Sequence, residues 1–277
     1  MEDTLRTCYE ALGFTQAPFS ITPDTGLFYP GSRHVAAYKQ LYHACTTGVI
    51  AVLSGEIGLG KTLVVRCVLR SLPETVRVAY LINPLMDLPD LLRSIGRDFG
   101  GPALPNNAPL SVLHNHLVET VLEGARDGAR FVVIVDEAHR LSGDSLEALR
   151  LLSNLETERS KLIGLVLVGQ PELERTLALR AMRPLRERVG VWLKLGPLSR
   201  DECAAYVRHR IKRTHRDGGF EFTGMALWWL QWQTRGVPRR INLACERAVL
   251  LAFAMSTRRV TASMMRQACR EFSEAWA

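Results

Sequence analysis

Residues 55–62 spell GEIGLGKT, which matches the pattern G-x-x-x-x-G-K-[ST] at every specified position. The apolar run 49–54 precedes the motif, and a stretch with helical spacing opens at Thr62. Glycines allow a backbone to turn tightly and to point its N–H groups at phosphates, and the helix that follows adds the positive end of its dipole. The motif therefore predicts a nucleotide-binding loop, formed by Gly55, Glu56, Ile57, Gly58, Leu59, Gly60, Lys61 and Thr62.

Two residues of this loop have predicted roles in binding phosphate and metal. Lys61 would reach the β- and γ-phosphates, and the hydroxyl of Thr62 would hold Mg²⁺. A second part of the same site is predicted where the apolar run 131–135 ends in Asp136 and Glu137. Ionised carboxylates are costly beside a core unless they are paired or bound to metal. Asp136 therefore suits the magnesium ion, and Glu137 suits the activation of an attacking water. The alternative is that the two acids lie in a solvated turn after the strand. The preceding phosphate loop favours the nucleotide site over this alternative.

Apolar periodicity divides the chain into two parts. Four short apolar runs alternate with amphipathic stretches, a pattern typical of a parallel sheet covered by helices on both faces; the runs are 49–54, 76–82, 131–136 and 162–169. From about Gly196 onward the apolar residues recur every three to four positions, with no strand run between the stretches 201–216, 224–236, 238–255 and 261–276. We expect an α/β nucleotide-binding domain at 1–195 and a small all-helical lid domain at 196–277.

Composition excludes several classes of protein. Apolar residues make up 47% of the chain, as in globular proteins, and no apolar run approaches the roughly 18 residues of a membrane-spanning helix. The N-terminus has no apolar core of a secretory signal. The six cysteines form no C-x-x-C pair, and His114 and His116 have no Cys or acidic partner at ligand spacing, so we expect reduced thiols, no zinc and a cytoplasmic location.

The charge is concentrated in one part of the chain. Residues 1–174 hold 15 Lys and Arg against 20 Asp and Glu, whereas residues 175–277 hold 20 against 8, a net charge of +12. A basic half is typical of proteins that bind nucleic acid or an anionic membrane surface. The alternative is that its arginines bind nucleotide phosphates, contact other subunits or lie on solvated helix faces. Charge alone does not decide between these interpretations.

The order of motifs resembles that of AAA+ ATPases: GEIGLGKT, VVIVDEAHRL, VLVGQPEL, PLRERV and RGVPRRIN follow one another along the chain. The stretches GFTQAPFSITPDTGLFY and GQPEL are similar more narrowly to the ExeA or general secretion pathway protein A group. Larger members of that group carry a transmembrane segment and a peptidoglycan-binding domain after the ATPase module. Because this chain stops at Ala277, it resembles the short members that serve mannose-sensitive haemagglutinin pili. The resemblance implies an AAA+ P-loop fold with a five-stranded parallel sheet and a helical lid.

The resemblance also implies roles for four further residues. Gln170 matches the first sensor, a polar side chain near the γ-phosphate, although an amide at a strand end can instead satisfy backbone groups. Arg186 and Arg188 match the position of the arginine finger, which a neighbouring subunit supplies to the transferred phosphate. The residues leave open which of the two is the finger, and one of them could instead pair with Glu187 or with another acid nearby. Arg239 matches the second sensor, on the lid.

The predicted function is therefore hydrolysis of ATP with Mg²⁺ in a ring-like homo-oligomer that powers or regulates assembly of a type II secretion or type IV pilus machine. The predicted location is cytoplasmic, with peripheral association at the inner membrane as an alternative, and the predicted partners are secretion or pilus assembly proteins. The rival interpretation is an AAA+ ATPase that binds duplex DNA and regulates a transposase, which the basic half favours. A third interpretation, a switch that binds ATP without turnover, is weakened by the intact pair Asp136 and Glu137.

Overall fold

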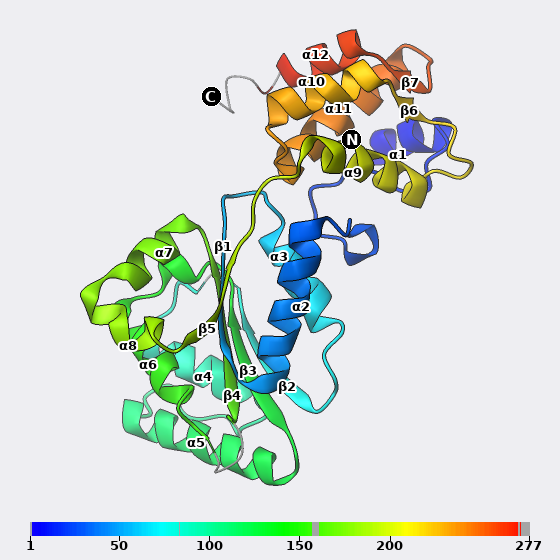
Figure 1. Cartoon of the computed structure of the whole chain (residues 1–277). Coiled ribbons are helices and arrows are strands. Elements are labelled where there is room, and N and C mark those ends of the chain that lie inside the picture. The colour runs from blue at the N-terminus through cyan, green and yellow to red at the C-terminus, as the bar shows by residue number, and fades with distance from the viewer. Residues whose placement is uncertain (1, 83, 157–160, 271, 273–277) are drawn as a thin grey trace. The chain divides into compact units, whose positions relative to one another are not determined.

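The computed structural model describes residues 2–82, 84–156, 161–270 and 272 (Figure 1). Its contacts divide the chain into two compact units. The sheet unit comprises residues 33–57 and 64–195, and the helical unit comprises residues 1–32, 58–63 and 196–277. The helical unit is thus assembled from three separate segments of the chain. The division into domains at 195/196 stays a prediction.

A five-stranded parallel sheet forms the centre of the sheet unit, in the order β2-β3-β4-β1-β5. The strands are β1 (Ile50–Ser54), β2 (Val76–Leu81), β3 (Arg130–Val135), β4 (Ile163–Gly169) and β5 (Val189–Lys194). Every residue of β1 and β4 is buried, because both strands have a neighbour on each side and helices over the sheet. The predicted five-stranded α/β fold is confirmed, and the four apolar runs are strands to within one residue at each end.

The fifth strand was not located by the apolar runs. β5 lies at the edge of the sheet and pairs only with β1, and its side chains alternate between half-buried and exposed. Trp192, in its middle, is 45% exposed. Every second side chain of β5 is exposed, so β5 has no continuous apolar run like the one that located β2 at the other edge of the sheet.

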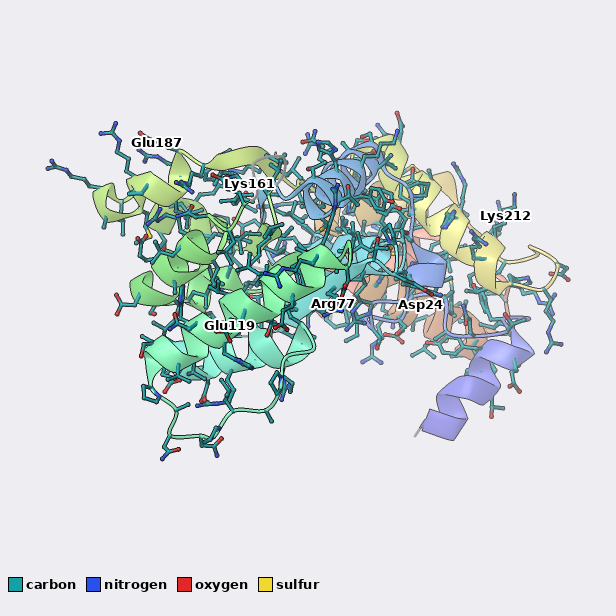
Figure 2. All side chains as sticks on the ribbon, turned by 90° about the horizontal axis from the view of Figure 1, so that it is seen from below. Asp24, Arg77, Glu119, Lys161, Glu187 and Lys212 are labelled. Atoms are coloured by element: carbon teal, nitrogen blue, oxygen red, sulfur yellow. The ribbon has the colours of Figure 1, made fainter. Side chains whose placement is uncertain are left out.

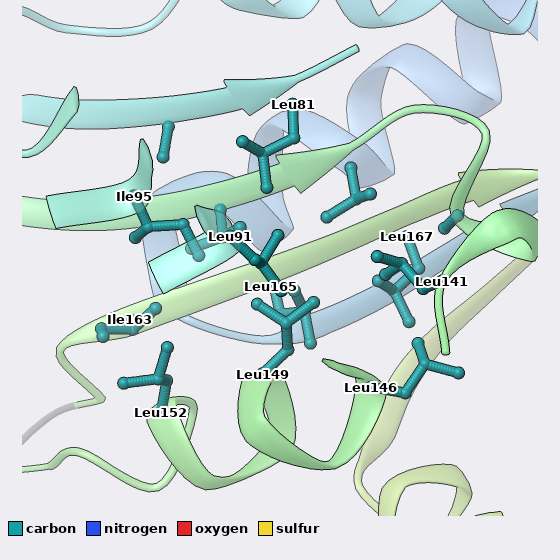
Figure 3. Packing of buried hydrophobic residues seen from close by; sticks show 14 of the residues in the cluster. Leu81, Leu91, Ile95, Leu141, Leu146, Leu149, Leu152, Ile163, Leu165 and Leu167 are labelled. Carbon is teal, nitrogen blue, oxygen red and sulfur yellow. The ribbon is translucent and has the colours of Figure 1, made fainter. Parts of the chain in front are cut away.

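Helices cover both faces of this sheet. They are α2 (Ser32–Thr47), α3 (Lys61–Leu69), α4 (Leu88–Asp98), α5 (Leu110–Arg126), α6 (Gly143–Leu152), α7 (Pro171–Ala178) and α8 (Arg183–Arg186), with the short 3₁₀ turns η2 (Ala138–Arg140) and η3 (Arg180–Met182). On one face, leucines of α4 and α6 pack against Leu165 and Leu167 of β4 (Figure 3). On the other face α2 approaches β4 so closely that a Cβ at Gly164 would lie 3.2 Å from the carbonyl oxygen of Ala44 (Figure 1).

The helical unit combines the N-terminal segment with the C-terminal helices. Its elements are α1 (Glu2–Ala11), η1 (Thr25–Leu27), α9 (Arg200–Thr214), α10 (Gly224–Thr234), α11 (Pro238–Ala254) and α12 (Ala262–Arg270), with the two-residue parallel strands β6 (Glu221–Phe222) and β7 (Arg259–Val260). The predicted helix 261–276 ends at Arg270; residues 271 and 273–276 lie outside the described part. The strand pair β6–β7 is too short to leave an apolar run in the sequence. Within the described ranges, no helix combines the length and apolar character needed to cross a bilayer.

The N-terminal segment is part of the core of the helical unit. Phe14 and Phe19 are almost fully buried among side chains of α9, α10, α11 and α12. The buried Arg210 donates a hydrogen bond from Nη1 to the carbonyl oxygen of Pro18 (3.1 Å), and Asn242 donates from Nδ2 to that of Ser20 (3.1 Å). These bonds explain why the stretch 12–20 follows an irregular path but remains fixed.

Candidate active site

The site is built where parallel strands end next to one another. Register pairs Val135 of β3 with Leu167 of β4, and Gly169 of β4 with Ser54 of β1. The residues that follow these strands are Asp136 and Gln170, and the nucleotide loop follows β1. Carboxyl ends of adjacent strands in an open α/β sheet form the usual ligand crevice. The sheet unit therefore brings Asp136, Glu137 and Gln170 together, while their roles stay predictions.

Asp136 is held with its carboxylate buried. The residue is 2% exposed, and its Oδ1 accepts a hydrogen bond from the backbone N–H of Glu137 (2.9 Å). The hydroxyl of Tyr80, from the end of β2, donates to Oδ2 at 3.4 Å. Burial and the nearby Asp136 carboxylate raise the pKa of Tyr80, so that this hydroxyl keeps its proton. Tyr80 is a contact of the acidic residue that the sequence analysis missed.

Glu137 is oriented by two other side chains. Its backbone has φ 56° and ψ 35°, a left-handed conformation that is uncommon outside glycine and often marks functional sites. Its Oε2 accepts a hydrogen bond from Nε2 of Gln170 (3.2 Å) and lies 3.5 Å from Nε2 of His139. Nδ1 of His139 in turn accepts from the backbone N–H of Gln170 at 3.5 Å. Gln170 therefore contacts the predicted catalytic carboxylate directly.

The loop between β1 and α3 has the geometry of a phosphate cradle. Gly58 and Gly60 have φ of +82° and +94°, which other residues adopt only with strain. Lys61 is 6% exposed and begins α3, and Thr62 follows it. The ammonium and the hydroxyl of this loop are groups that nucleotide phosphates and Mg²⁺ require, and the buried carboxylate of Asp136, in the sheet unit, is of the kind that Mg²⁺ prefers. These residue types fit ATP with Mg²⁺, and their joint site stays a prediction.

Ser54, the last residue of β1, anchors the start of this loop. Its hydroxyl donates a hydrogen bond to the carboxylate of Glu174 on α7, and Nζ of Lys194 lies 3.7 Å from the same carboxylate. The backbone carbonyl of Ser54 accepts from the N–H of Leu195 (2.8 Å). Ser54 and Glu174 carry no motif in the sequence, because their role depends on the proximity of β1 to α7.

In the helical unit, Arg239 lies beside the loop. It is the second residue of α11, and its backbone N–H donates a hydrogen bond to the carbonyl oxygen of Gly58 (3.1 Å). A Cβ added at Gly58 would lie 2.7 Å from Cβ of Arg239 and 3.3 Å from Cγ1 of Val237. The structure thus places Arg239 against the loop residue Gly58, which is where a residue that senses phosphate has to be. Its contact with a nucleotide stays a prediction.

We expect Gly58→Ala to destabilise the protein by about 1–3 kcal/mol, because the left-handed backbone and the overlap with Arg239 act together. Denaturant unfolding and ATP affinity should both be measured, since the same strain distorts the loop. Gly224→Ala is the matched control, because a Cβ there meets no atom within 4 Å. Equal stability of the two variants would show that Gly58 is not under this constraint.

The two arginines proposed as fingers differ in their contacts. Nη1 of Arg186, at the end of α8, donates a hydrogen bond to the carbonyl oxygen of Ala178 (3.1 Å). The side chain of Arg188 is exposed and makes no hydrogen bond or ion pair with the residues that the structure describes, while its backbone N–H donates to the carbonyl oxygen of Leu185 (3.0 Å). Glu187 pairs with Arg183 at 2.7 Å. A hydrogen bond from Arg150 and the charges of Arg150 and Arg188 lower the pKa of Glu147, so Arg188 has another acid nearby and a structural role for it stays open.

Comparisons with known proteins bear on the fold and on the family. A family model described as AAA domain matches residues 45–177. The chain is 39% identical over 251 residues to General secretion pathway protein A of Aeromonas hydrophila, an alignment that covers 90% of this chain and 45% of that protein. The chain therefore spans less than half the length of this relative.

Two solved structures have the same fold at low sequence identity. Cdc6p from Pyrobaculum aerophilum has a TM-score of 0.71 at 17% identity, covering 92% of this chain and 70% of that chain. ORC2 of Aeropyrum pernix, in ADPNP and ADP complexes, has a TM-score of 0.66 at 20% identity, covering 93% of this chain and 72% of that chain. The parallel sheet and the nucleotide loop therefore lie in a chain whose residues 45–177 match the AAA domain model and whose sequence is similar to General secretion pathway protein A over 90% of its length.

Proposed function

We propose that this protein hydrolyses ATP by in-line attack of water. The observation that carries the proposal is the cluster of Asp136, Glu137 and Gln170 at the adjacent ends of β3 and β4, beside the strand that leads into the phosphate loop. Glu137 accepts the proton of the attacking water, and Gln170 orients the water and the carboxylate of Glu137. Lys61 binds the β- and γ-phosphates. Thr62 and Asp136 would hold Mg²⁺, which would supply positive charge beside these phosphates.

The finger residue comes from a second copy of the chain in this proposal. Arg186 is engaged with a backbone carbonyl, whereas the guanidinium of Arg188 makes no hydrogen bond or ion pair within the described part of the chain, which favours Arg188 as the residue that reaches a neighbouring site. A contact that joins a different surface on each copy closes into a ring when its rotation allows. The active form is therefore a ring-like homo-oligomer, in which Arg239 reports the γ-phosphate to the helical unit.

The work that ATP hydrolysis performs is assembly of a secretion or pilus machine. The support is the 39% identity with General secretion pathway protein A, together with the stretch 13–29 that is shared with that group. The partners are assembly proteins at the inner membrane, where the cytoplasmic protein associates peripherally. The narrower assignment to mannose-sensitive haemagglutinin pili rests on the early sequence resemblance alone.

The second candidate function, regulation of a transposase on duplex DNA, is favoured by the basic helix α9. Arg208, Lys212, Arg213 and Arg216 are exposed, and Figure 2 shows Lys212 on α9. Arg210, in the middle of the same row, is 3% exposed and is committed to Pro18, so it cannot neutralise a DNA phosphate. The remaining basic residues are spread around α9. They do not form a single row on one face of the helix that could contact DNA phosphates.

We expect the Glu137→Gln protein, locked with ATP, to co-purify with identified secretion or pilus assembly proteins, and the Lys61→Ala protein to lose them. The ATP-bound Glu137→Gln protein should bind duplex DNA only weakly. This binding should not depend on ATP and should be lost near physiological salt. The affinity of a duplex binder that neutralises several phosphates would fall linearly with the logarithm of salt concentration. Both variants should be titrated with DNA at several salt concentrations.

One outcome reverses this assignment. Nucleotide-dependent filaments on DNA, or tight DNA binding at physiological salt, would replace the secretion function by the transposition one. That outcome would leave the proposed ATP hydrolysis intact, because the two candidate functions share the same site.

A further inference from the structure

A cavity of about 470 Å³ lies in the sheet unit, between α4, α5 and the loop 99–109 that joins them. Its floor is apolar and includes the buried side chains of Leu92, Leu113 and Leu117. The loop contributes exposed residues to the rim, among them Ala103. This volume falls in the range of roughly 300–1,000 Å³ that is typical of small-molecule sites. None of the lining residues belongs to the candidate active site.

Two side chains in the lining have a buried nitrogen with no hydrogen-bond partner, namely Nε of Arg93 and Nε2 of His116. The guanidinium of Arg93 is nevertheless fixed. Its Nη1 pairs with the carboxylate of Asp90, and its Nη2 donates to the carbonyl oxygen of Asn106 (2.9 Å). Nε is the guanidinium nitrogen that has no partner, and its N–H can be donated to a ligand. A buried donor without a partner costs free energy that a ligand acceptor would recover.

His116 can present a second donor. Its Nδ1 lies 3.7 Å from the carboxylate of Glu119 on α5, a distance too long for a hydrogen bond (Figure 2 labels Glu119). Nε2 is the ring nitrogen of His116 that has no hydrogen-bond partner. The cavity thus joins an apolar floor to one fixed cationic donor and one imidazole nitrogen that is open to a ligand.

We infer that this cavity binds a small amphipathic carboxylate. The apolar part of the ligand packs on Leu92, Leu113 and Leu117, and its carboxylate accepts hydrogen bonds from Arg93 and His116. Arg93 favours an anion, because a charge-assisted hydrogen bond is about twice as strong as a neutral one. A free phosphate group would leave the apolar floor of the cavity without a contact. An amine is disfavoured, because the lining holds two guanidinium groups, of Arg93 and Arg97, against the one carboxylate of Asp90.

Calorimetric titration of the full chain with octanoate tests the inference, with octanol as the uncharged ligand of equal length. We expect one octanoate to bind per chain and octanol to bind about tenfold more weakly, the value of a hydrogen bond to a charged group. Along the series hexanoate, octanoate and decanoate, affinity should rise by up to about fourfold per methylene until the cavity is filled.

Two variants assign the binding to this cavity. Arg93→Gln should remove the preference for octanoate over octanol, and Ala103→Phe, on the exposed loop, should weaken both ligands by filling the mouth. Arg126→Gln, on the exposed end of α5, is the control and should bind octanoate as the parent does. Circular dichroism should confirm that each variant is folded. The two cavity variants change different elements, so if one of them misfolds the other still tests the inference.

Three results would overturn the inference: no saturable binding of octanoate, equal affinity for octanol, or unchanged binding by the Ala103→Phe protein. The site is independent of ATP. The Lys61→Ala protein should therefore bind octanoate with the parental affinity, so failure of the proposed ATP hydrolysis and failure of this site can be told apart.

Discussion

Replacing Glu137 by Gln is expected to lower the rate of ATP hydrolysis by about a hundredfold or more and to leave ATP affinity unchanged. A general base contributes roughly 10²–10⁴ to a rate, and the carboxylate acts on water only during the reaction. Gln keeps the shape of Glu137 and one hydrogen-bonding oxygen, so its contact with Gln170 can be retained. Nucleotide affinity and phosphate release should be measured on the same preparation.

Lys61→Ala is the matched variant, because it is expected to affect ATP binding, whereas Glu137→Gln is expected to affect hydrolysis. Lys61 contacts ground-state phosphates, so its loss should weaken ATP binding by about a hundredfold, the upper range for a charge-assisted hydrogen bond. Affinity lost in one variant and turnover lost in the other would separate binding from chemistry. If the Glu137→Gln protein hydrolyses ATP at the parental rate, the assignment of Glu137 as the base is wrong.

A mixture of two inactive proteins should recover activity when the finger comes from a neighbour. One protein carries Glu137→Gln, and the other carries Arg186→Ala together with Arg188→Ala. Removal of a finger costs about 10³–10⁵ in rate, so each protein alone should be close to inactive. In randomly mixed rings, about a quarter of the interfaces pair an intact Glu137 with an intact finger, so about a quarter of the parental rate should return.

The single-arginine variants then decide which residue is the finger. Arg188→Ala should lose as much activity as the double variant, whereas Arg186→Ala should retain most of it, because Arg186 is engaged with Ala178. Sizing must confirm that mixed oligomers form. Mixed oligomers without any recovered hydrolysis would contradict a finger that acts between subunits. Activity per chain should also rise with protein concentration.

Four of the five strands could be predicted from the sequence, whereas the roles of the residues at their ends stay predictions. Buried parallel strands are continuous apolar runs, and the acids after β3 are out of place in a core, so both signals are local. The loop 55–62 is likewise contiguous in sequence. That Gln170 lies next to Glu137 depends on the pairing of β3 with β4, an order of strands that the sequence did not predict.

The contacts that depend on tertiary packing could not be predicted. His139 reaches Gln170 only because η2 turns back toward the end of β4. Ser54 meets Glu174 across two elements that are 120 residues apart in sequence. Arg210 looked like one of several surface charges on α9, and it is buried because the N-terminal segment supplies a carbonyl for it. None of these pairs has a fixed sequence spacing, so no pattern in the chain reports them.

The assembly of the helical unit from distant segments has a consequence for the newborn protein. Phe14 and Phe19 emerge from the ribosome first, but the helices that bury them begin at Arg200. At about 5–20 residues per second, these side chains wait on the order of ten seconds or more for their partners. The sheet unit, residues 33–57 and 64–195, can complete its synthesis within that interval. Throughout it, the N-terminal segment is an exposed apolar tail, and a chaperone that binds such tails has its longest opportunity here.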